Sequence, residues 1–154
     1  MSTMKVSFPG GKRVDAEYNG FTIRTDQSAR SGGEGSAPQP FDLFLASVAT
    51  CAGFYVKAYC DARQIPADGL ALQMHVERDH EGHRVGRLVV EILLPEGFPE
   101  KHREAIVRAA DQCAVKKHIL EPPVIEIATR LHEPSPDGPV EGNVTQAMAL
   151  AEGR

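Results

Sequence analysis

The chain has 154 residues, 17 of them basic and 21 acidic, so its formal net charge is −4. Charged residues make up 25% and apolar residues 42%. These values are ordinary for a globular domain and exclude a disordered chain, a collagen-like chain and a coiled-coil rod. No basic run is longer than two residues, as at Lys116-Lys117. We therefore expect neither nucleic acid nor a membrane surface as a partner.

The three cysteines indicate a reducing compartment, because an odd count in a chain of this length does not fit a paired disulfide framework. Residues Met1 to Gly11 lack the apolar run of a signal peptide, so we expect a cytoplasmic protein. The longest apolar stretch, Leu43 to Val56, is shorter than the ~20 residues of a membrane span. It predicts a buried core helix.

Alternating apolar residues predict a β-hairpin near the N-terminus. Val14, Ala16 and Tyr18 precede Asn19-Gly20, and the alternation resumes at Phe21 and Ile23. A further strand is expected around Val6–Phe8. The segment Thr25–Pro40 is rich in Gly, Ser and Pro but lacks the spacing of a phosphate-binding loop. We predict a mobile loop there, either a plain linker or a cover for a nearby site.

The next segment, Phe41–Arg63, predicts a helix that is apolar on nearly every side, with Pro40 in its first turn. After a turn at Ile65–Gly69, alternation over Leu70–Val76 and Leu88–Leu94 predicts a long antiparallel pair of strands.

Helical spacing of Ile106, Ala109, Ala110 and Cys113 predicts an amphipathic helix from Pro99 to about His118, lying on a sheet. A last strand is expected over Ile125–Leu131. We place a single domain at residues 1–131 and a flexible tail at residues 132–154, with a weak helix at Val144–Ala151.

These elements give an α+β fold with antiparallel sheets around a central buried helix, because the regular alternation of a parallel sheet is absent. A helix that is apolar all round needs cover on every side, and one small sheet covers one face. We therefore predict a homodimer, which a monomer found by light scattering would contradict.

The cysteines offer two interpretations. Cys51 and Cys113 each lie on the apolar face of a predicted helix and could meet in the core, whereas Cys60 is nine residues beyond Cys51 and faces the opposite way. Buried cysteines usually behave as small apolar residues, so a purely structural role is the alternative to a redox pair.

Two segments carry a family resemblance: Pro40-Phe41-Asp42-Leu43-Phe44-Leu45-Ala46-Ser47-Val48-Ala49-Thr50-Cys51, and Cys113-Ala114-Val115-Lys116 about sixty residues later. With the order of elements around them, they make residues 5–131 resemble the OsmC/Ohr family of osmotically induced and organic hydroperoxide resistance proteins. The resemblance implies an intertwined homodimer with two active sites at the interface and thiol-dependent reduction of hydroperoxides.

By this resemblance Cys51 is the peroxidatic thiol and Cys113 the resolving one. A thiolate attacks the O–O bond, becomes a sulfenic acid and condenses with a second thiol. The family stabilises the thiolate with an arginine from the N-terminal sheet, and Arg13 best matches that position. The substitutes are Lys12, Arg24 and Arg30.

One position departs from the Ohr branch. That branch carries a glutamate two residues before the leucine of the helix-opening motif, and here the residue is Phe41. The adjacent Asp42 is the candidate supporting acid, although a shift of one residue turns a helical side chain by about 100°. The chain thus resembles the less characterised OsmC-like branch.

The resulting hypothesis is a peroxidase of organic hydroperoxides without a bound cofactor, reduced by an external dithiol that could be a lipoyl group. An apolar substrate pocket is expected from Phe41, Phe44, Phe54 and Tyr55. The alternatives are a non-catalytic dimer that binds a small apolar ligand at its interface and, with less support because Cys-x-x-Cys is absent, a protein dithiol–disulfide exchanger. No metal site is expected from the histidines, among them His75, His80, His83 and His118.

Overall fold

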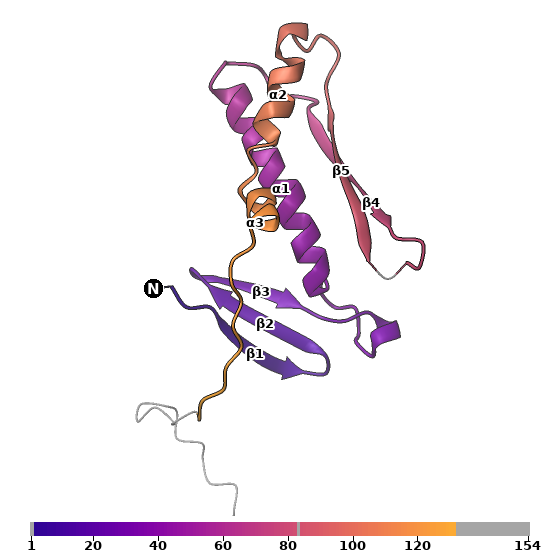
Figure 1. Cartoon of the computed structure of the whole chain (residues 1–154), viewed down its shortest axis with the longest axis vertical. Coiled ribbons are helices and arrows are strands. Elements are labelled where there is room, and N and C mark those ends of the chain that lie inside the picture. The colour runs from indigo at the N-terminus through magenta and orange to yellow at the C-terminus, as the bar shows by residue number, and fades with distance from the viewer. Residues whose placement is uncertain (1, 83, 132–154) are drawn as a thin grey trace, which may run out of the picture. The chain divides into compact units, whose positions relative to one another are not determined.

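A computed structural model describes residues 2–82 and 84–131. The predicted tail at residues 132–154, its helix at Val144–Ala151, and His83 lie outside the described residues. The chain separates into two compact units, residues 1–123 and 124–154, and each is considered by itself. Helices and two small antiparallel sheets confirm the predicted α+β class (Figure 1). Two 3₁₀ turns accompany them, η1 (Ala29–Ser31) and η2 (Glu100–His102).

The first sheet has three antiparallel strands in the order β1-β2-β3. They are β1 (Lys5–Gly10), β2 (Arg13–Tyr18) and β3 (Phe21–Thr25). The hairpin predicted at Asn19-Gly20 is confirmed, and both turn residues have positive φ, 49° and 81°, as a type I′ turn requires. Val6, Ala16 and Ile23 lie opposite one another across the three strands, so one face of this sheet is apolar.

The loop between β3 and α1 is held by a buried carboxylate, contrary to the prediction of a mobile loop. Asp26 is 1% exposed and accepts hydrogen bonds from the N–H groups of Gln27, Glu34 and Ser36 and from the Ser36 hydroxyl. The two bonds from Ser36 lower the pKa of Asp26 most, and burial opposes them by raising it. With the bonds from the N–H groups of Gln27 and Glu34, they outweigh burial and lower the pKa from the usual 3.8 to about 2. The carboxylate thus stabilises the fold above about pH 4, and this contribution is lost as the pH falls toward 2.

Helix α1 (Pro40–Asp61) begins where the sequence predicts, with Pro40 in its first turn and a capping box between Gln39 and Asp42. Its buried side chains lie one helical turn apart: Val48, Ala52, Val56 and Cys60. Because other apolar side chains of the helix stay partly or largely exposed, the chain alone covers only one stripe of it. Among the described residues α1 is also the one helix long and apolar enough to cross a membrane, a test that core helices of soluble proteins also pass.

The predicted strand pair is confirmed as the antiparallel hairpin β4 (Ala71–Arg78) and β5 (Val85–Leu93). Leu72 and Met74 of β4 lie opposite Ile92 and Val90 of β5, which gives the hairpin one apolar face.

The predicted helix from Pro99 to His118 is wrong as a single element. The structure has α2 (Arg103–Ala110) and α3 (Ala114–Leu120), separated by an extended residue, Cys113, with φ −45° and ψ 117°. At this position the Cys113 sulfur accepts a backbone hydrogen bond from the first turn of α3, which the sulfur of an uninterrupted helix would not do.

Helix α2 packs chiefly against α1 rather than on a sheet, as Figure 1 shows. Ile106 is 1% exposed and forms the core with Val56 and Cys60 of α1 and with Phe98. Ile92 and Leu94 at the end of the hairpin pack against this cluster. The core therefore lies at the C-terminal end of α1.

The strand predicted at Ile125–Leu131 is absent, since residues 122–131 form neither helix nor strand. Ile125, Ile127 and Leu131 are 82%, 95% and 95% exposed. A strand needs a neighbour to accept and donate its ladder hydrogen bonds, and this segment has none within the described part of its own unit.

Candidate functional site

Cys51 and Cys113 meet, as the sequence predicts, although about sixty residues separate them. Cys51 lies in the middle of α1, and Cys113 is the residue that precedes the first turn of α3. Their side chains are in hydrogen-bond contact, and both are free thiols. Cys60 lies apart from them in the core with Phe98 and Ile106.

Cys113 contacts two backbone groups. Its Sγ atom accepts the Lys116 N–H at 3.4 Å and lies 3.9 Å from the Val48 carbonyl oxygen, which competes with the Cys51 sulfur for its single S–H proton. The side chain is 2% exposed. Cys113 therefore presents its sulfur to Cys51 from a buried position between α1 and α3.

The Cys51 thiol has a lowered pKa. Burial alone raises it, but the N–H of Val115, the Cys113 thiol and the N–H of Ala114 all donate to the Cys51 sulfur and together outweigh the burial. Hydrogen bonds to a charged form stabilise that form. Cys51 therefore ionises more readily than an ordinary cysteine.

The other two thiols are favoured in the protonated form. Burial is the largest cause that raises the pKa of Cys113, and the neighbouring Cys51 adds to it, against the opposing Lys116 N–H. Burial, followed by the Asp61 charge, raises the pKa of Cys60. The site thus pairs a thiol that ionises more readily than an ordinary cysteine with one that ionises less readily.

Alkylation should distinguish the three thiols. Since only a thiolate reacts, we expect iodoacetamide to modify Cys51 first, with a pH midpoint below the ordinary ~8.5, while Cys60 and Cys113 react slowly. Mass spectrometry of the modified peptides against pH measures this. A fast phase that persists in Cys51→Ser would contradict the assignment.

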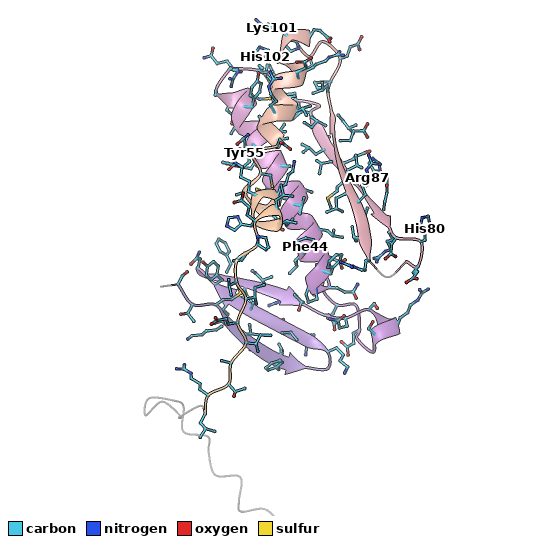
Figure 2. All side chains as sticks on the ribbon, viewed as in Figure 1. Phe44, Tyr55, His80, Arg87, Lys101 and His102 are labelled. Atoms are coloured by element: carbon cyan, nitrogen blue, oxygen red, sulfur yellow. The ribbon has the colours of Figure 1, made fainter. Side chains whose placement is uncertain are left out.

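A cavity of about 1140 Å³ opens between α1, β5, α2 and α3. Phe44 and Arg87, both labelled in Figure 2, lie on facing sides of it, and Cys113 contributes to its wall. Much of the lining is apolar, including Phe41, Val90 and Ile106. Cys51 itself is not among the residues that line the cavity, so an apolar molecule in it meets the thiol pair at Cys113.

Several cationic side chains line the cavity. Arg87 pairs with Glu77 at 3.3 Å, and Lys116 pairs with Asp111. Arg78 and Arg84 also line the cavity and form no ion pair within residues 2–82 and 84–131. The hairpin end of the cavity is therefore positively charged.

Only two of the four aromatic residues predicted for a substrate pocket line the cavity. Phe41 and Phe44 line the cavity and stack on each other, with ring centroids 5.4 Å apart. Phe54 and Tyr55 are not among the residues that line it, and they pack edge to face with each other at 5.3 Å. The candidate acid, Asp42, accepts the Gln39 N–H at 2.9 Å and so caps α1.

No candidate cation contacts a thiol in the described part of the chain. The Arg13 guanidinium donates to the carbonyl oxygens of Pro9 and Gly10 in its own hairpin, at 3.2 and 3.4 Å. The substitutes, Lys12, Arg24 and Arg30, are exposed and form no hydrogen bond or ion pair with either cysteine. Activation of Cys51 by Arg13 stays a prediction.

Sequence reasoning missed the backbone groups that act on the thiols. The amides of Ala114, Val115 and Lys116 all point to sulfur atoms, which follows from the break before α3. No local signal marked them, because every residue except proline carries a backbone N–H. The buried Asp26 was also missed. No group of three metal-ligating side chains occurs among residues 2–82 and 84–131.

Comparison with protein-family models shows to which family the chain belongs. The family model described as OsmC-like protein matches residues 33–128, which include both cysteines and most of the cavity. The chain belongs to the OsmC-like family. Comparison with curated proteins gave no match.

Solved structures share this OsmC-like fold. A Psychrobacter arcticus protein described as an osmotic stress induced and detoxification response protein has 24% identity and a TM-score of 0.65, with 76% of this chain and 87% of that chain covered. An organic hydroperoxide resistance protein OsmC from Legionella pneumophila has 20% identity and a TM-score of 0.51, with 77% and 88% covered. An OsmC-like protein from Mycoplasma pneumoniae has 16% identity and a TM-score of 0.57, with 78% and 87% covered. At these identities the likeness establishes the fold.

Proposed function

We propose that the protein is a thiol-dependent peroxidase that reduces organic hydroperoxides. The observation that carries this proposal is the contact between Cys51, whose pKa is lowered, and the buried Cys113, whose pKa is raised. Family membership supports it, as does the description of the Legionella relative as an organic hydroperoxide resistance protein.

The reaction needs both sulfur atoms. The Cys51 thiolate attacks the distal oxygen of the hydroperoxide, the O–O bond breaks, and the alkoxide takes a proton and leaves as the alcohol. Cys51 is then a sulfenic acid. The Cys113 thiol gives up its proton to the departing hydroxide as its sulfur attacks, so the S–S bond forms and water leaves. An external dithiol, for which a lipoyl group is the proposed class, reduces the disulfide and is itself oxidised to a cyclic disulfide.

The apolar lining favours hydroperoxides with a bulky apolar group. Phe41 and Phe44 line the cavity with aliphatic side chains of β5 and α2. We expect the reduced protein with a lipoyl dithiol to consume cumene hydroperoxide at least about tenfold faster than hydrogen peroxide, because apolar contacts stabilise only the former. Peroxide assays with and without the dithiol measure this. Faster consumption of hydrogen peroxide would refute the apolar pocket.

We further propose that the protein acts in the cytoplasm as a homodimer. The exposed apolar residues of α1, such as the 66% exposed Phe54, favour a partner. The alternating segment Ile125–Leu131 also lacks a strand partner in its own unit among the described residues. Light scattering should therefore give twice the chain mass.

A non-catalytic dimer that binds a small apolar ligand is the second candidate. Phe41 in place of the glutamate and the lack of a described cation on Cys51 favour it. Slow alkylation of Cys51 at neutral pH, with no peroxide consumed, would support this candidate over the peroxidase.

A further inference from the structure

Asp26 is a buried carboxylate that the proposed chemistry does not use. It lies between β3 and the loop that leads to α1 and is 1% exposed. Its Oδ1 atom accepts the Gln27 N–H at 2.7 Å, and its Oδ2 atom accepts the Glu34 N–H at 3.2 Å, the Ser36 N–H at 3.0 Å and the Ser36 hydroxyl at 2.8 Å. Four donors therefore converge on one side chain.

These bonds close the loop into one shape. The Asp26 N–H donates to the Pro38 carbonyl oxygen at 3.2 Å, which joins the two ends of the loop. A Cβ atom on Gly33 would lie 2.0 Å from the Gln27 carbonyl oxygen, so only glycine fits there. The Asp26 carboxylate thus holds Ser36, and the Asp26 backbone N–H holds Pro38, two residues before α1 begins.

The first two turns of α1 have little else in their own chain to hold them. Phe41 and Phe44 are 47% and 38% exposed, and the first buried side chain of the helix is Val48. The capping box between Gln39 and Asp42 caps the start of the helix but anchors it to nothing beyond itself. The position of this end therefore depends on the clamped loop.

We propose that Asp26 is a positioning residue for the cavity: by clamping the loop at Ser36, its carboxylate holds the start of α1 so that Phe41 and Phe44 lie where the apolar group of the hydroperoxide binds. This inference rests on the proposed function. Cys51 lies about three turns further along α1 and has its own contacts with α3. Loss of the clamp should therefore weaken substrate binding and leave the chemical step unchanged.

The test compares Asp26→Asn with a matched control in the same loop, Glu34→Gln, which removes an exposed carboxylate with no partner in the described residues. The asparagine amide would face N–H donors and cannot accept from all of them. We expect its KM for cumene hydroperoxide to rise about tenfold with kcat within about twofold, whereas the control is unchanged. A lowered kcat at unchanged KM would overturn the proposal.

Two readouts do not depend on turnover. Trypsin should cleave after the exposed Arg30 faster in Asp26→Asn than in wild type or Glu34→Gln. Calorimetry with cumyl alcohol, the product of cumene hydroperoxide, should give a higher Kd for Asp26→Asn. An unchanged Kd overturns the positioning role even if the protein proves to have no peroxidase activity, so the two proposals fail separately.

Ser36→Ala covers the case in which Asp26→Asn does not fold. It removes only the 2.8 Å hydroxyl bond to Asp26 and keeps the three amide bonds. Its KM and Kd should rise in the same direction by a smaller factor, about twofold to fourfold. Values equal to those of wild type would contradict the clamp.

Discussion

Replacing Cys51 by serine should lower the rate of hydroperoxide consumption on the order of 10³-fold or more, because a serine hydroxyl near neutral pH supplies almost no anion to attack the O–O bond. The thiolate of Cys51 is the group that the amides of Ala114 and Val115 stabilise. The measurement is the loss of cumene hydroperoxide by the reduced variant in the presence of a lipoyl dithiol.

The other two cysteines are the matched controls. Without added dithiol, Cys113→Ser should react once and stop at a Cys51 sulfenic acid, which dimedone traps, because the thiol in contact with Cys51 is gone. Cys60→Ser should change the rate by less than about twofold, since Cys60 lies in the core rather than at the site. Full activity in Cys51→Ser would remove Cys51 from the mechanism.

Replacing Ile106 by alanine should lower the free energy of unfolding by about 2–5 kcal/mol, the usual cost of a cavity at a buried isoleucine. Ile106 is 1% exposed and joins α2 to Val56 and Cys60 of α1. Urea denaturation followed by circular dichroism measures the change.

The control for this substitution is on the same helix. Val107 is 58% exposed, so Val107→Ala should cost less than about 1 kcal/mol. Equal losses for the two variants would mean that α2 does not pack through Ile106 as described.

Local patterns in the sequence predicted much of the fold because they depend on neighbouring residues. The turn at Asn19-Gly20 needs residues that accept positive φ. Pro40 marks the start of α1 because proline fits the first helical turn. The alternation in β4 and β5 reflects a hairpin with one apolar face, which a two-residue period reveals.

Features that depend on distant groups were not predictable in this way. The apolar spacing continues through Cys113, so nothing local indicates the break, which instead accompanies sulfur contacts with Val48 and Lys116. The clamp at Asp26 joins residues up to ten apart in a segment without periodicity. The alternation at Ile125–Leu131 predicts a strand, but a strand also requires a partner that its own unit does not provide in the described residues.

The candidate site likewise has parts that the sequence predicts and parts that it does not. The pairing of Cys51 with Cys113 followed from the family resemblance and from the apolar faces on which both lie. The groups that lower the pKa of Cys51 are backbone amides, which every residue except proline possesses, so the sequence does not single them out. The cationic end of the cavity depends on Arg78 and Arg84, which only the hairpin brings to it.

The central claim is that one hydroperoxide molecule oxidises Cys51 and Cys113 to a disulfide. Mass spectrometry of the reduced protein after one equivalent of cumene hydroperoxide tests it most directly. The account predicts the loss of two hydrogen atoms, a peptide that joins Cys51 to Cys113, and a free Cys60. A protein that keeps all its thiols, or a disulfide that includes Cys60, would contradict it.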